Sequence, residues 1–500
     1  MGRLPALSFD PLNIKDFASE SNKVIEFITN YYKTVHKYPV RSQVEPGYLQ
    51  DLYPKTAPFQ PTSLETILQE IQTDIIPGIT HWQSPNFFAY FPATISNAAF
   101  HGEMLCNALN IVGFNWICSP AATELEMIVM DWLGKMFNLP QSFLFEGKGG
   151  GVLQGSTSEA LVCLLATARD RALKQYGEDS ITKLVVYASD QTHFVVKKAA
   201  KLVGIPPKNF RVIPTSLSTC FALKPNDVKM AIERDLESGL VPLFLCATVG
   251  ATSSSSVDPV EGLGLLAQKY GLWLHVEAAY AGSAFVCPEL RHYLKGIEHA
   301  DSISMNLHKW LLTNLDCSCM WLKKPSVLLD SLSMTADYMR NEASESKQVV
   351  DFMDWQIASG RRFRALKLWL VLRRYGVKNL MTHIRSDLDL AKHFEALVRS
   401  DKRFEVVVPV NFSLVCFRLK PNEEAEESLK ILNWKLMEAV NSSGRAYMTH
   451  AVLGDMFVIR CALGTSSTEE KHVNELWNLI QEKTRLILKE KCWNELQFPI

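Results

Sequence analysis

The segment 304–310, SMNLHKW, holds the side chain best suited to covalent chemistry in this sequence. Lys309 follows a predicted strand and stands between His308 and Trp310. A lysine at a strand end, partly removed from water, is a useful amine for a Schiff base because desolvation lowers its pKa. A surface lysine beside an aromatic ring would show the same local pattern. This segment alone therefore leaves both interpretations open.

A second unusual feature is an acid at the end of an apolar run. Glu277, in HVEAAYAG at 275–282, is followed by small residues. A buried carboxylate needs a cationic or hydrogen-bonding partner. A pyridinium nitrogen is one such partner, and the small residues would let a flat ring lie close to the backbone. The alternative is an acid that emerges into solvent at a strand end.

The segment 149–160, GGGVLQGSTSEA, reads as a glycine loop that runs into an apolar helix. Hydroxyl side chains and exposed backbone N–H groups at a helix start form a phosphate site. A plain capped helix would look the same. His193, in SDQTH at 189–193, follows an apolar run and could stack on a ring or cap a helix. Pyridoxal phosphate would fit these four features taken together in their order along the chain: a phosphate cradle, a stacking histidine, an acid and a lysine.

These residues need a scaffold, and the pattern between about 95 and 390 predicts one. Short apolar runs alternate there with helix-length stretches, which suits strand–helix–strand units of a mostly parallel sheet. Ligands of such sheets bind at loops on the carboxyl ends of the strands. The predicted strands are LVVYAS at 184–189, RVIP at 211–214, PLFLCATVG at 242–250, LWLHV at 272–276 and SCMWL at 318–322.

The chain divides into three predicted units. Residues 1–95 form an N-terminal helical arm, with one helix in 22–35 and another from Ser63 to Pro77, joined by proline-rich chain. Because this arm has little core of its own, we expect it to be buried against the remaining chain or a second subunit. Residues 96–390 form the large cofactor-binding domain, and 391–500 form a small α+β domain with strand-like RFEVVV, FSLVCFRL and MFVIRCALG.

Composition narrows the partners. The 500 residues include 52 Lys and Arg against 53 Asp and Glu, a net charge of −1 that argues against nucleic acid or an anionic membrane. No apolar run approaches the roughly 20 residues of a membrane helix, and the N-terminus shows no secretory signal. Eleven cysteines without CxxC pairs suggest reduced thiols and no metal site. We expect a cytoplasmic protein.

The chain resembles the plant aromatic L-amino-acid decarboxylases, a group of pyridoxal-phosphate enzymes, in the branch of tryptophan and tyrosine decarboxylases and aromatic aldehyde synthases. The resemblance covers almost the whole chain and implies an α/β transferase fold of type I with a mostly parallel, seven-stranded sheet. It also implies a homodimer with active sites at the subunit interface and the arm swapped over the partner. The strings that carry it are VEPGYL at 44–49, HWQSPNFFAYFPA at 81–93, SPAATELEMIVMDWL at 119–133, DWQIASGRRFRALKLW at 354–369 and FSLVCFRL at 412–419.

The resemblance also implies roles for individual residues. Lys309 would form the internal aldimine with pyridoxal phosphate, His193 would stack on its ring, and Glu277 would face the pyridine nitrogen. The other expected cofactor contacts are Ser156, Thr157, Ser158, Thr252, Ala279, Asn306 and His308. The expected walls of the substrate pocket are Trp82, Tyr90, Phe91, Pro92, Ala93, Phe114 and Gly360, although plain core packing would also explain the aromatic members.

Two positions bear on the product and the substrate. Tyr338, in LSMTADYMRN at 332–341, matches the family's proton donor on a loop that reaches the partner's site, where aldehyde synthases carry Phe. Together with His193, it favours simple decarboxylation of an aromatic L-amino acid to the arylethylamine and CO2. Gly360 stands where enzymes acting on phenols tend to have Ser, which favours tryptophan or phenylalanine over tyrosine or DOPA.

Two departures from the family pattern keep other functions open. Glu277 replaces the usual Asp and adds about 1.5 Å of reach, which could impair the fit to the cofactor. Leu307 replaces the usual Pro and leaves the backbone before Lys309 less restrained, as in some aldehyde synthases. The alternatives are therefore an aromatic aldehyde synthase and a weakly active dimer that binds pyridoxal phosphate.

Overall fold

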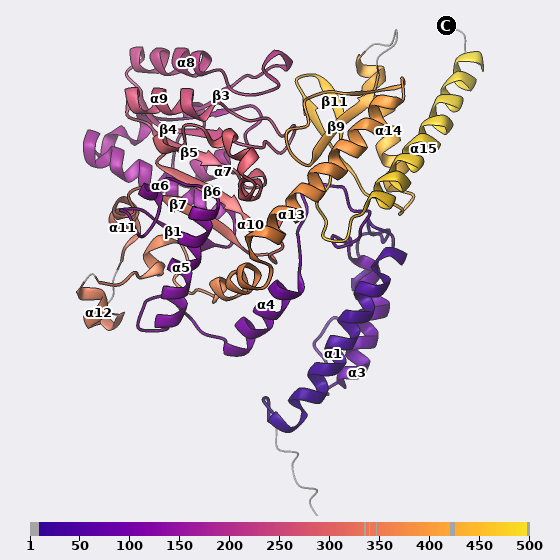
Figure 1. Ribbon diagram of the computed structural model, residues 1–500, viewed down its shortest axis with the longest axis horizontal. Helices are drawn as coiled ribbons and strands as arrows, with labels where there is room; N and C mark the ends of the chain where they lie inside the picture. Colours follow the sequence, from indigo (N-terminus) through magenta and orange to yellow (C-terminus); the bar gives the residue numbers. More distant parts are fainter. Residues whose placement is uncertain (1–9, 335–336, 340, 347, 421–425, 498–500) are drawn as a thin grey trace, which may run out of the picture.

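The computed structural model describes residues 10–334, 337–339, 341–346, 348–420 and 426–497, without the side chains of residues 338 and 490–497. A large α/β body, a smaller body around β9 and β11, and a projecting rod of α1 and α3 make up the molecule (Figure 1). No helix within these residues is both long and apolar enough to cross a membrane.

The rod contains the first helices of the chain. Asn13 caps α1 by accepting the N–H of Lys15, and Ser63 caps α3 by accepting the N–H of Thr66 at 3.2 Å. The helix expected from Ser63 to Pro77 starts as predicted, but α-helical geometry ends at Glu70 and a π-helical turn continues the segment. No residue of α1 is buried. The helices are α1 (Ile14–Thr34), α2 (Tyr48–Leu52) and α3 (Leu64–Glu70).

The large body is built on a seven-stranded sheet in the order β1-β7-β6-β5-β4-β2-β3. Strands β3, β2, β4, β5 and β6 are parallel, whereas β7 is antiparallel to both β6 and β1. The predicted mostly parallel sheet is therefore confirmed. Its strands are β1 (Gly150–Gln154), β2 (Leu184–Ser189), β3 (Phe210–Ile213), β4 (Val241–Thr248), β5 (Trp273–Glu277), β6 (Ser302–Asn306) and β7 (Ser318–Leu322).

Four of the five predicted strands, β2, β4, β5 and β7, are apolar runs buried on both faces, as expected for a sheet covered by helices. The fifth, β3, is the edge strand, and only Ile213 is buried in it. The interpretation of 149–155 as a glycine loop is wrong for Gly150–Gln154, which is strand β1. Small residues are needed there because a Cβ at Gly151 would lie 2.7 Å from the ring of Trp321. Close packing, rather than a turn, explains these glycines.

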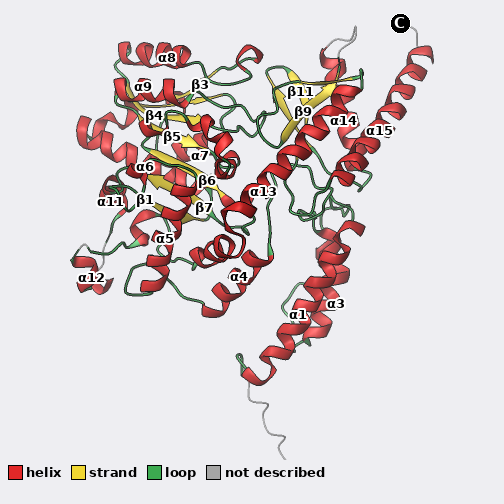
Figure 2. Cartoon of the chain, viewed as in Figure 1, coloured by secondary structure: helices red, strands yellow, loops and turns green. Residues whose placement is uncertain are grey.

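Helices flank the large sheet and join it to the small body (Figure 2). The long α13 passes from the large body to the small one and changes direction at Gly376, whose φ is 65°. The helices are α4 (Asn97–Leu109), α5 (Pro120–Met136), α6 (Thr157–Tyr176), α7 (Val195–Leu202), α8 (Pro225–Glu237), α9 (Val260–Tyr270), α10 (Leu307–Trp310), α11 (Ser326–Leu332), α12 (Glu342–Glu345) and α13 (Arg364–Ser400).

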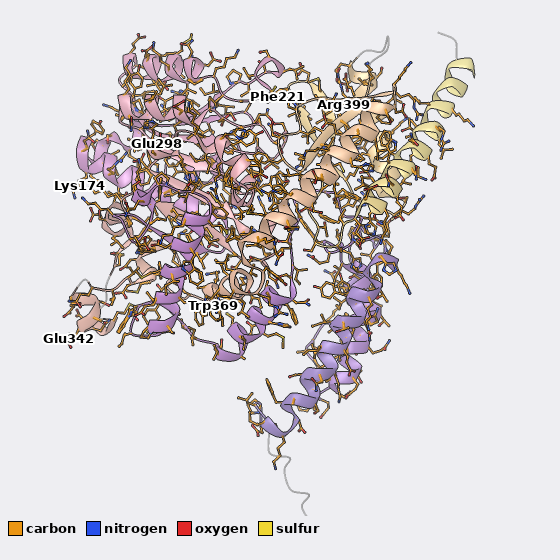
Figure 3. The ribbon with its side chains drawn as sticks, viewed as in Figure 1. Lys174, Phe221, Glu298, Glu342, Trp369 and Arg399 are labelled. Atoms are coloured by element: carbon orange, nitrogen blue, oxygen red, sulfur yellow. The ribbon has the colours of Figure 1, made fainter. Side chains whose placement is uncertain are left out.

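The small body is an antiparallel sheet with two helices, in the order β10-β11-β9-β8. Charged side chains such as Lys174 and Glu342 project from the outer helices of the molecule, whereas Phe221 is buried (Figure 3). The elements of the small body are β8 (Phe404–Val406), β9 (Leu414–Leu419), α14 (Glu426–Asn441), β10 (Thr449–Leu453), β11 (Met456–Ala462) and α15 (Glu470–Gln497).

Candidate active site

Lys309 lies on α10, a single helical turn that follows β6. The N–H of Leu307 donates to the carbonyl of Cys317 at 3.0 Å, and the N–H of Cys317 donates to Nδ1 of His308 at 3.0 Å. The His308 carbonyl accepts the N–H of Thr94 at 2.9 Å, so the turn is held from two sides. Burial lowers the pKa of the Lys309 amine. A fixed lysine with a lowered pKa suits attack on a carbonyl.

Glu277 is the last residue of β5 and is buried beside this turn. Its Oε1 accepts the N–H of Ala279 at 2.9 Å, and the Ala279 carbonyl accepts the N–H of Asn306 at 2.9 Å. The Glu277 carboxylate opposes the burial effect by raising the pKa of Lys309 and of His193. The predicted acid therefore belongs to the same electrostatic environment as the predicted lysine and histidine.

His193 lies on the loop between β2 and α7. Its Nδ1 accepts the N–H of Val195 at 3.3 Å, which ties the ring to the start of α7. Burial lowers the pKa of His193, and the Lys309 cation lowers it further. A neutral imidazole is the form that stacks on an aromatic ring without a charge penalty.

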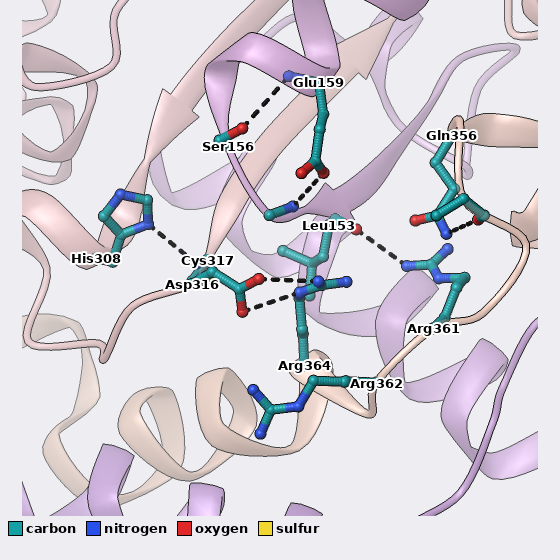
Figure 4. A network of polar contacts seen from close by, with 12 residues as sticks. Leu153, Ser156, Glu159, His308, Asp316, Cys317, Gln356, Arg361, Arg362 and Arg364 are labelled. Atoms are coloured by element: carbon teal, nitrogen blue, oxygen red, sulfur yellow. Dashed lines mark hydrogen bonds and ion pairs between the residues drawn. The ribbon is translucent and has the colours of Figure 1, made fainter. Parts of the chain in front are cut away.

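The segment predicted to cradle a phosphate is the capped start of α6 (Figure 4). Ser156 caps the helix by accepting the N–H of Glu159 at 3.4 Å, and the Glu159 carboxylate accepts the N–H of Gly155 at 3.0 Å. Thr157 Oγ1 donates to Asn306 Oδ1 at 2.8 Å, which joins the cradle to the strand before Lys309. The positive end of a 20-residue helix lies at this point.

Two further hydroxyl residues complete this region. Ser158 lies in the first turn of α6, and Ser318 Oγ on β7 donates to Asn306 Oδ1 at 2.7 Å. Asn306 therefore receives two hydroxyl hydrogen bonds on one oxygen. Its amide group is therefore positioned by α6, β6 and β7 together. The sequence predicted Asn306, Ser156, Thr157 and Ser158 as cofactor contacts but not the contribution of Ser318 on β7.

A stack of aromatic rings lies beside Lys309. The ring centroids of Phe91 and Tyr280 are 3.8 Å apart, and those of Tyr280 and Trp310 are 4.7 Å apart, with interplanar angles of 12° and 15°. Lys309 Nζ lies 5.6 Å from the Phe91 centroid. Phe91 is therefore the predicted pocket residue that the structure brings to the lysine.

The neighbouring predicted wall residues differ in exposure. Trp82 and Tyr90 stack at 5.5 Å between ring centroids and are 37% and 47% exposed, so they form an open aromatic surface. Pro92 is buried, and the Ala93 carbonyl accepts a hydrogen bond from Gln83 Nε2 at 2.6 Å. Trp82 and Tyr90 thus form an exposed aromatic pair, whereas Phe91 is buried and lies near Lys309.

Arg460, on β11, is a site residue that the sequence analysis missed. It is buried, its guanidinium carbon lies 5.2 Å from the Phe91 centroid, and its charge lowers the pKa of Lys309. Nη1 donates to Thr449 Oγ1 and Nη2 to the Tyr90 carbonyl, while Nε has no hydrogen-bond partner among the described residues. The sequence signal for this residue is an arginine inside the apolar run MFVIRCALG. A cation buried with such a strand needs partners, which indicates a candidate binding site.

Phe114 and Gly360 belong to a second cluster. The N–H of Met353 donates to the Phe114 carbonyl at 2.9 Å, and the N–H of Gly113 donates to the Arg361 carbonyl at 3.2 Å. These bonds tie the two predicted pocket segments to each other. They do not tie either segment to the Lys309 turn.

A buried ion pair anchors this second cluster, and Figure 4 shows the accompanying contact of Arg361 with the Leu153 carbonyl. Arg361 Nη2 lies 2.7 Å from Glu126 Oε1 and also donates to the Leu153 carbonyl at 3.1 Å. Glu126 Oε1 in turn accepts the N–H of Leu153 at 2.8 Å. The guanidinium lies over the ring of Phe352 at 4.6 Å. The segment that carries Gly360 is therefore fixed to α5 and β1.

Thr252 and Tyr338 are the two remaining predicted site residues. Thr252 is half-buried on the loop after β4, where Ser253 Oγ donates to Gln191 and the Ser253 carbonyl accepts from Cys416 Sγ. This loop lies next to the His193 loop as a result. The side chain of Tyr338 lies outside the described residues.

Comparison with known proteins gives a consistent result. The family described as "Pyridoxal-dependent decarboxylase conserved domain" matches residues 46–420. Phenylacetaldehyde synthase from a Rosa hybrid cultivar is 57% identical over 95% of each chain, and tyrosine decarboxylase from Papaver somniferum is 55% identical over 98% and 100%. The structure of Oryza sativa TDC with PLP and tryptamine has 48% identity and a TM-score of 0.95, covering 96% and 100%.

The chain belongs to the pyridoxal-dependent decarboxylase family. Its fold is that of these decarboxylases, and its cofactor is pyridoxal phosphate. The described residues fit this cofactor, since a desolvated lysine, a buried acid, a small residue at Ala279 and a capped helix start lie around connected strand ends. No group of three or more His, Cys, Asp or Glu in the described ranges is arranged to hold a metal ion.

Proposed function

We propose that this decarboxylase converts an aromatic L-amino acid, with tryptophan or phenylalanine favoured over tyrosine or DOPA, to the arylethylamine and CO2. The observation that carries the proposal is the arrangement around Phe91, whose ring lies 5.6 Å from Lys309 Nζ and 5.2 Å from the Arg460 guanidinium. An amine, an aromatic surface and a cation in one buried space suit the groups of an aromatic amino acid. The proposed compartment is the cytoplasm.

Each residue has a definite task in this proposal. Pyridoxal phosphate, when bound, supplies the electron-accepting ring that makes loss of CO2 possible. Lys309 would hold the cofactor through Nζ, and the Glu277 carboxylate would keep its pyridine nitrogen protonated. His193 and Ala279 would pack against the cofactor ring. Ser156, Thr157, Ser158, Asn306, Thr252 and His308 hold the phosphate and the ring edge.

Arg460 binds the substrate carboxylate in this proposal. Its Nε is the donor that the described protein leaves unused, and burial strengthens a charge-assisted hydrogen bond. Phe91 and Trp82 face the aromatic side chain of the substrate. Tyr338 then delivers a proton from its hydroxyl to the carbon that has lost CO2, which produces an amine.

The proposal includes a homodimer in which the arm, residues 1–95, lies over the partner, next to the large domain 96–390 and the small domain 391–500. Support comes from apolar side chains left exposed on α4 and the following loop and on the arm. Burying such residues is the main source of association free energy. They include Met104, Leu105, Leu109, Val112, Ile117, Leu12, Ile14 and Phe17.

Aromatic aldehyde synthesis is the second candidate function. It is favoured by the 57% identity to a phenylacetaldehyde synthase and by Leu307 in place of Pro. In that reaction O2 accepts electrons, and the products are aldehyde, CO2, ammonia and hydrogen peroxide. Tyr338 and His193 favour the amine instead.

The test is to incubate the purified protein with pyridoxal phosphate and separately with tryptophan, phenylalanine, tyrosine and DOPA. Mass spectrometry quantifies amine and aldehyde, and Lys309→Ala is the control without a cofactor-binding amine. Tryptamine or phenylethylamine as the main product supports the proposal. Tyramine or dopamine as the fastest product would overturn the substrate preference, and aldehyde as the main product would overturn the reaction.

A further inference from the structure

A buried acid outside the site contacts the residue that follows Lys309. Asp387, on α13, is 4% exposed, and its Oδ2 accepts the indole N–H of Trp310 at 2.7 Å. The Trp310 ring is fully buried. This hydrogen bond joins α13 to α10, the single turn on which Lys309 stands.

Trp310 also lies at one end of the aromatic stack. Its ring packs on Tyr280 at 4.7 Å, and Tyr280 packs on Phe91 at 3.8 Å. Phe91 in turn lies 5.6 Å from Lys309 Nζ. Because buried rings in close contact transmit displacement, a shift of Trp310 moves both the backbone under Lys309 and the ring beside its amine.

The small body secures the same acid. Ser413, just before β9, has its Oγ 2.5 Å from the Leu463 carbonyl and 3.2 Å from the Asp387 carbonyl, and its N–H donates to the Tyr280 hydroxyl at 3.2 Å. Asp387 and Tyr280 are therefore both held by one residue of the small body. The arrangement connects α10, α13 and β9 through side chains that are all buried.

The charge state of this acid is set by few neighbours. Burial raises the pKa of Asp387 to about 7, and the Trp310 N–H opposes that rise. His383 lies one turn earlier on α13 with its Nε2 3.6 Å from Asp387 Oδ2, and burial lowers the pKa of His383 to about 4. Tyr280, on the segment after β5, is close enough for the Asp387 carboxylate to raise the pKa of its hydroxyl, and no cation among these groups compensates a carboxylate. A neutral residue that accepts the indole N–H should therefore replace Asp387 well.

We propose that Asp387 is a positioning residue for Lys309, acting through its hydrogen bond to Trp310 and the stack of Trp310, Tyr280 and Phe91. The proposal predicts that loss of the acceptor misplaces the amine, whereas an asparagine preserves it. Misplacement by about 1 Å lowers the rate of the chemical step up to about a hundredfold while leaving substrate binding nearly intact.

The test compares Asp387→Leu, which removes the acceptor at similar size, with Asp387→Asn, which keeps it. Trp310→Phe removes the donor but keeps a stacking ring. Asp389→Leu is the matched control, since Asp389 is exposed on the same helix and pairs only with Lys392 among the described residues. Each variant is loaded with pyridoxal phosphate, and the absorbance of the Lys309-bound cofactor is titrated with pH. Then kcat and KM are measured, and thermal unfolding reports the folded fraction.

Asp387→Leu and Trp310→Phe should shift the absorbance titration by about half a pH unit or more and lower kcat about tenfold or more, with KM changed less than about threefold. Asp387→Asn and Asp389→Leu should match the wild type. An unchanged titration and kcat per folded molecule in both disrupted variants would overturn the proposal, even with lower thermal stability. If Asp387→Leu does not fold, the absorbance titration and kcat of Trp310→Phe alone decide whether the proposal holds.

This inference rests on the proposed role of Lys309, but its failure is distinguishable from failure of the proposed function. The absorbance titration requires only bound cofactor. Wild-type protein that binds pyridoxal phosphate but makes no arylethylamine would contradict the proposed function. The absorbance titration of the variants would still test whether Asp387 positions Lys309.

Discussion

The side chain of Glu277 is long enough for its carboxylate to bind the backbone two residues further along the chain. Its Oε1 accepts the N–H of Ala279, the residue proposed to pack on the cofactor ring. Glu277→Asp withdraws the carboxylate by about 1.5 Å and breaks that contact or the one to the cofactor. We expect kcat to fall about tenfold, and Glu277→Gln, which removes the charge, to fall further. Steady-state kinetics at saturating cofactor measure this; a gain for the Asp variant would mean that Glu277 restrains the enzyme.

Gly360 offers a test of substrate choice. A Cβ at this position would meet no atom within 4 Å, so a serine fits without displacing described neighbours. A hydroxyl can hydrogen-bond a phenol, whereas glycine offers it no partner. We expect Gly360→Ser to raise kcat/KM for tyrosine relative to phenylalanine about tenfold, with Gly360→Ala as the control for volume. Equal ratios in all three proteins would exclude a role for Gly360 in recognition.

Single residues also show where sequence reasoning reached its limit. Lys309, Glu277 and His193 could be proposed from the sequence because each lies at or after the end of a predicted strand, in a recognisable order along the chain. For Arg460 the local pattern shows only a cation inside an apolar run; it does not reveal that the guanidinium lies 5.2 Å from the Phe91 ring. Leu307 was expected to loosen the backbone, yet its N–H donates to Cys317, a bond that proline lacks.

At the scale of elements, the segment 351–361 depends on one buried ion pair. Arg361 and Glu126 fix it to α5 and β1, and both side chains are almost fully buried. Removing one member leaves an uncompensated charge, which typically costs about 3–5 kcal/mol. Arg361→Met should therefore markedly lower the urea midpoint of unfolding. Lys392→Met, which breaks an exposed pair, is the control and should change it little; equal effects would contradict the burial argument.

The pKa of Asp387 makes a further prediction about α13. The unfolded chain releases this proton near pH 4, whereas the folded protein holds it to about pH 7. Between these values the folded state binds more protons, so the stability contributed by this group falls as pH rises. The side chain of Asp387→Asn does not titrate. The free energy of unfolding of this variant, relative to that of the wild type, should therefore rise by about 1–3 kcal/mol from pH 5 to pH 8. Urea unfolding at both values measures the difference; a constant difference would contradict a raised pKa.

The elements were predictable to different degrees. Strands β2, β4, β5 and β7 were visible because burial on both faces makes them continuous apolar runs. β1 was hidden by its glycines, and β10 by alternating exposure at a sheet edge. The grouping of Phe114 with Gly360 depends on backbone bonds between segments more than 200 residues apart, which no local pattern encodes.

At the scale of the whole molecule, the proposed dimer shares its sites between subunits. If Tyr338 serves the partner's Lys309, a mixed dimer of Lys309→Ala and Tyr338→Phe subunits regains one intact site. We expect amine production in the mixture to rise severalfold above either variant alone, approaching about a quarter of wild type with random pairing. Co-expression with two affinity tags isolates the mixed dimer. Activity no greater than that of the variants would place Tyr338 and Lys309 of one chain in the same site.

Proposed amine formation and the alternative of aldehyde formation differ in whether hydrogen peroxide is released. The most direct measurement is the ratio of hydrogen peroxide to CO2 released from L-tryptophan and L-phenylalanine in air-saturated buffer by the loaded wild-type protein. Proton delivery by Tyr338 predicts CO2 matched by arylethylamine, with a peroxide-to-CO2 ratio near zero. A ratio near one, with aldehyde and ammonia in equal amount, would contradict the account and establish the aldehyde synthase.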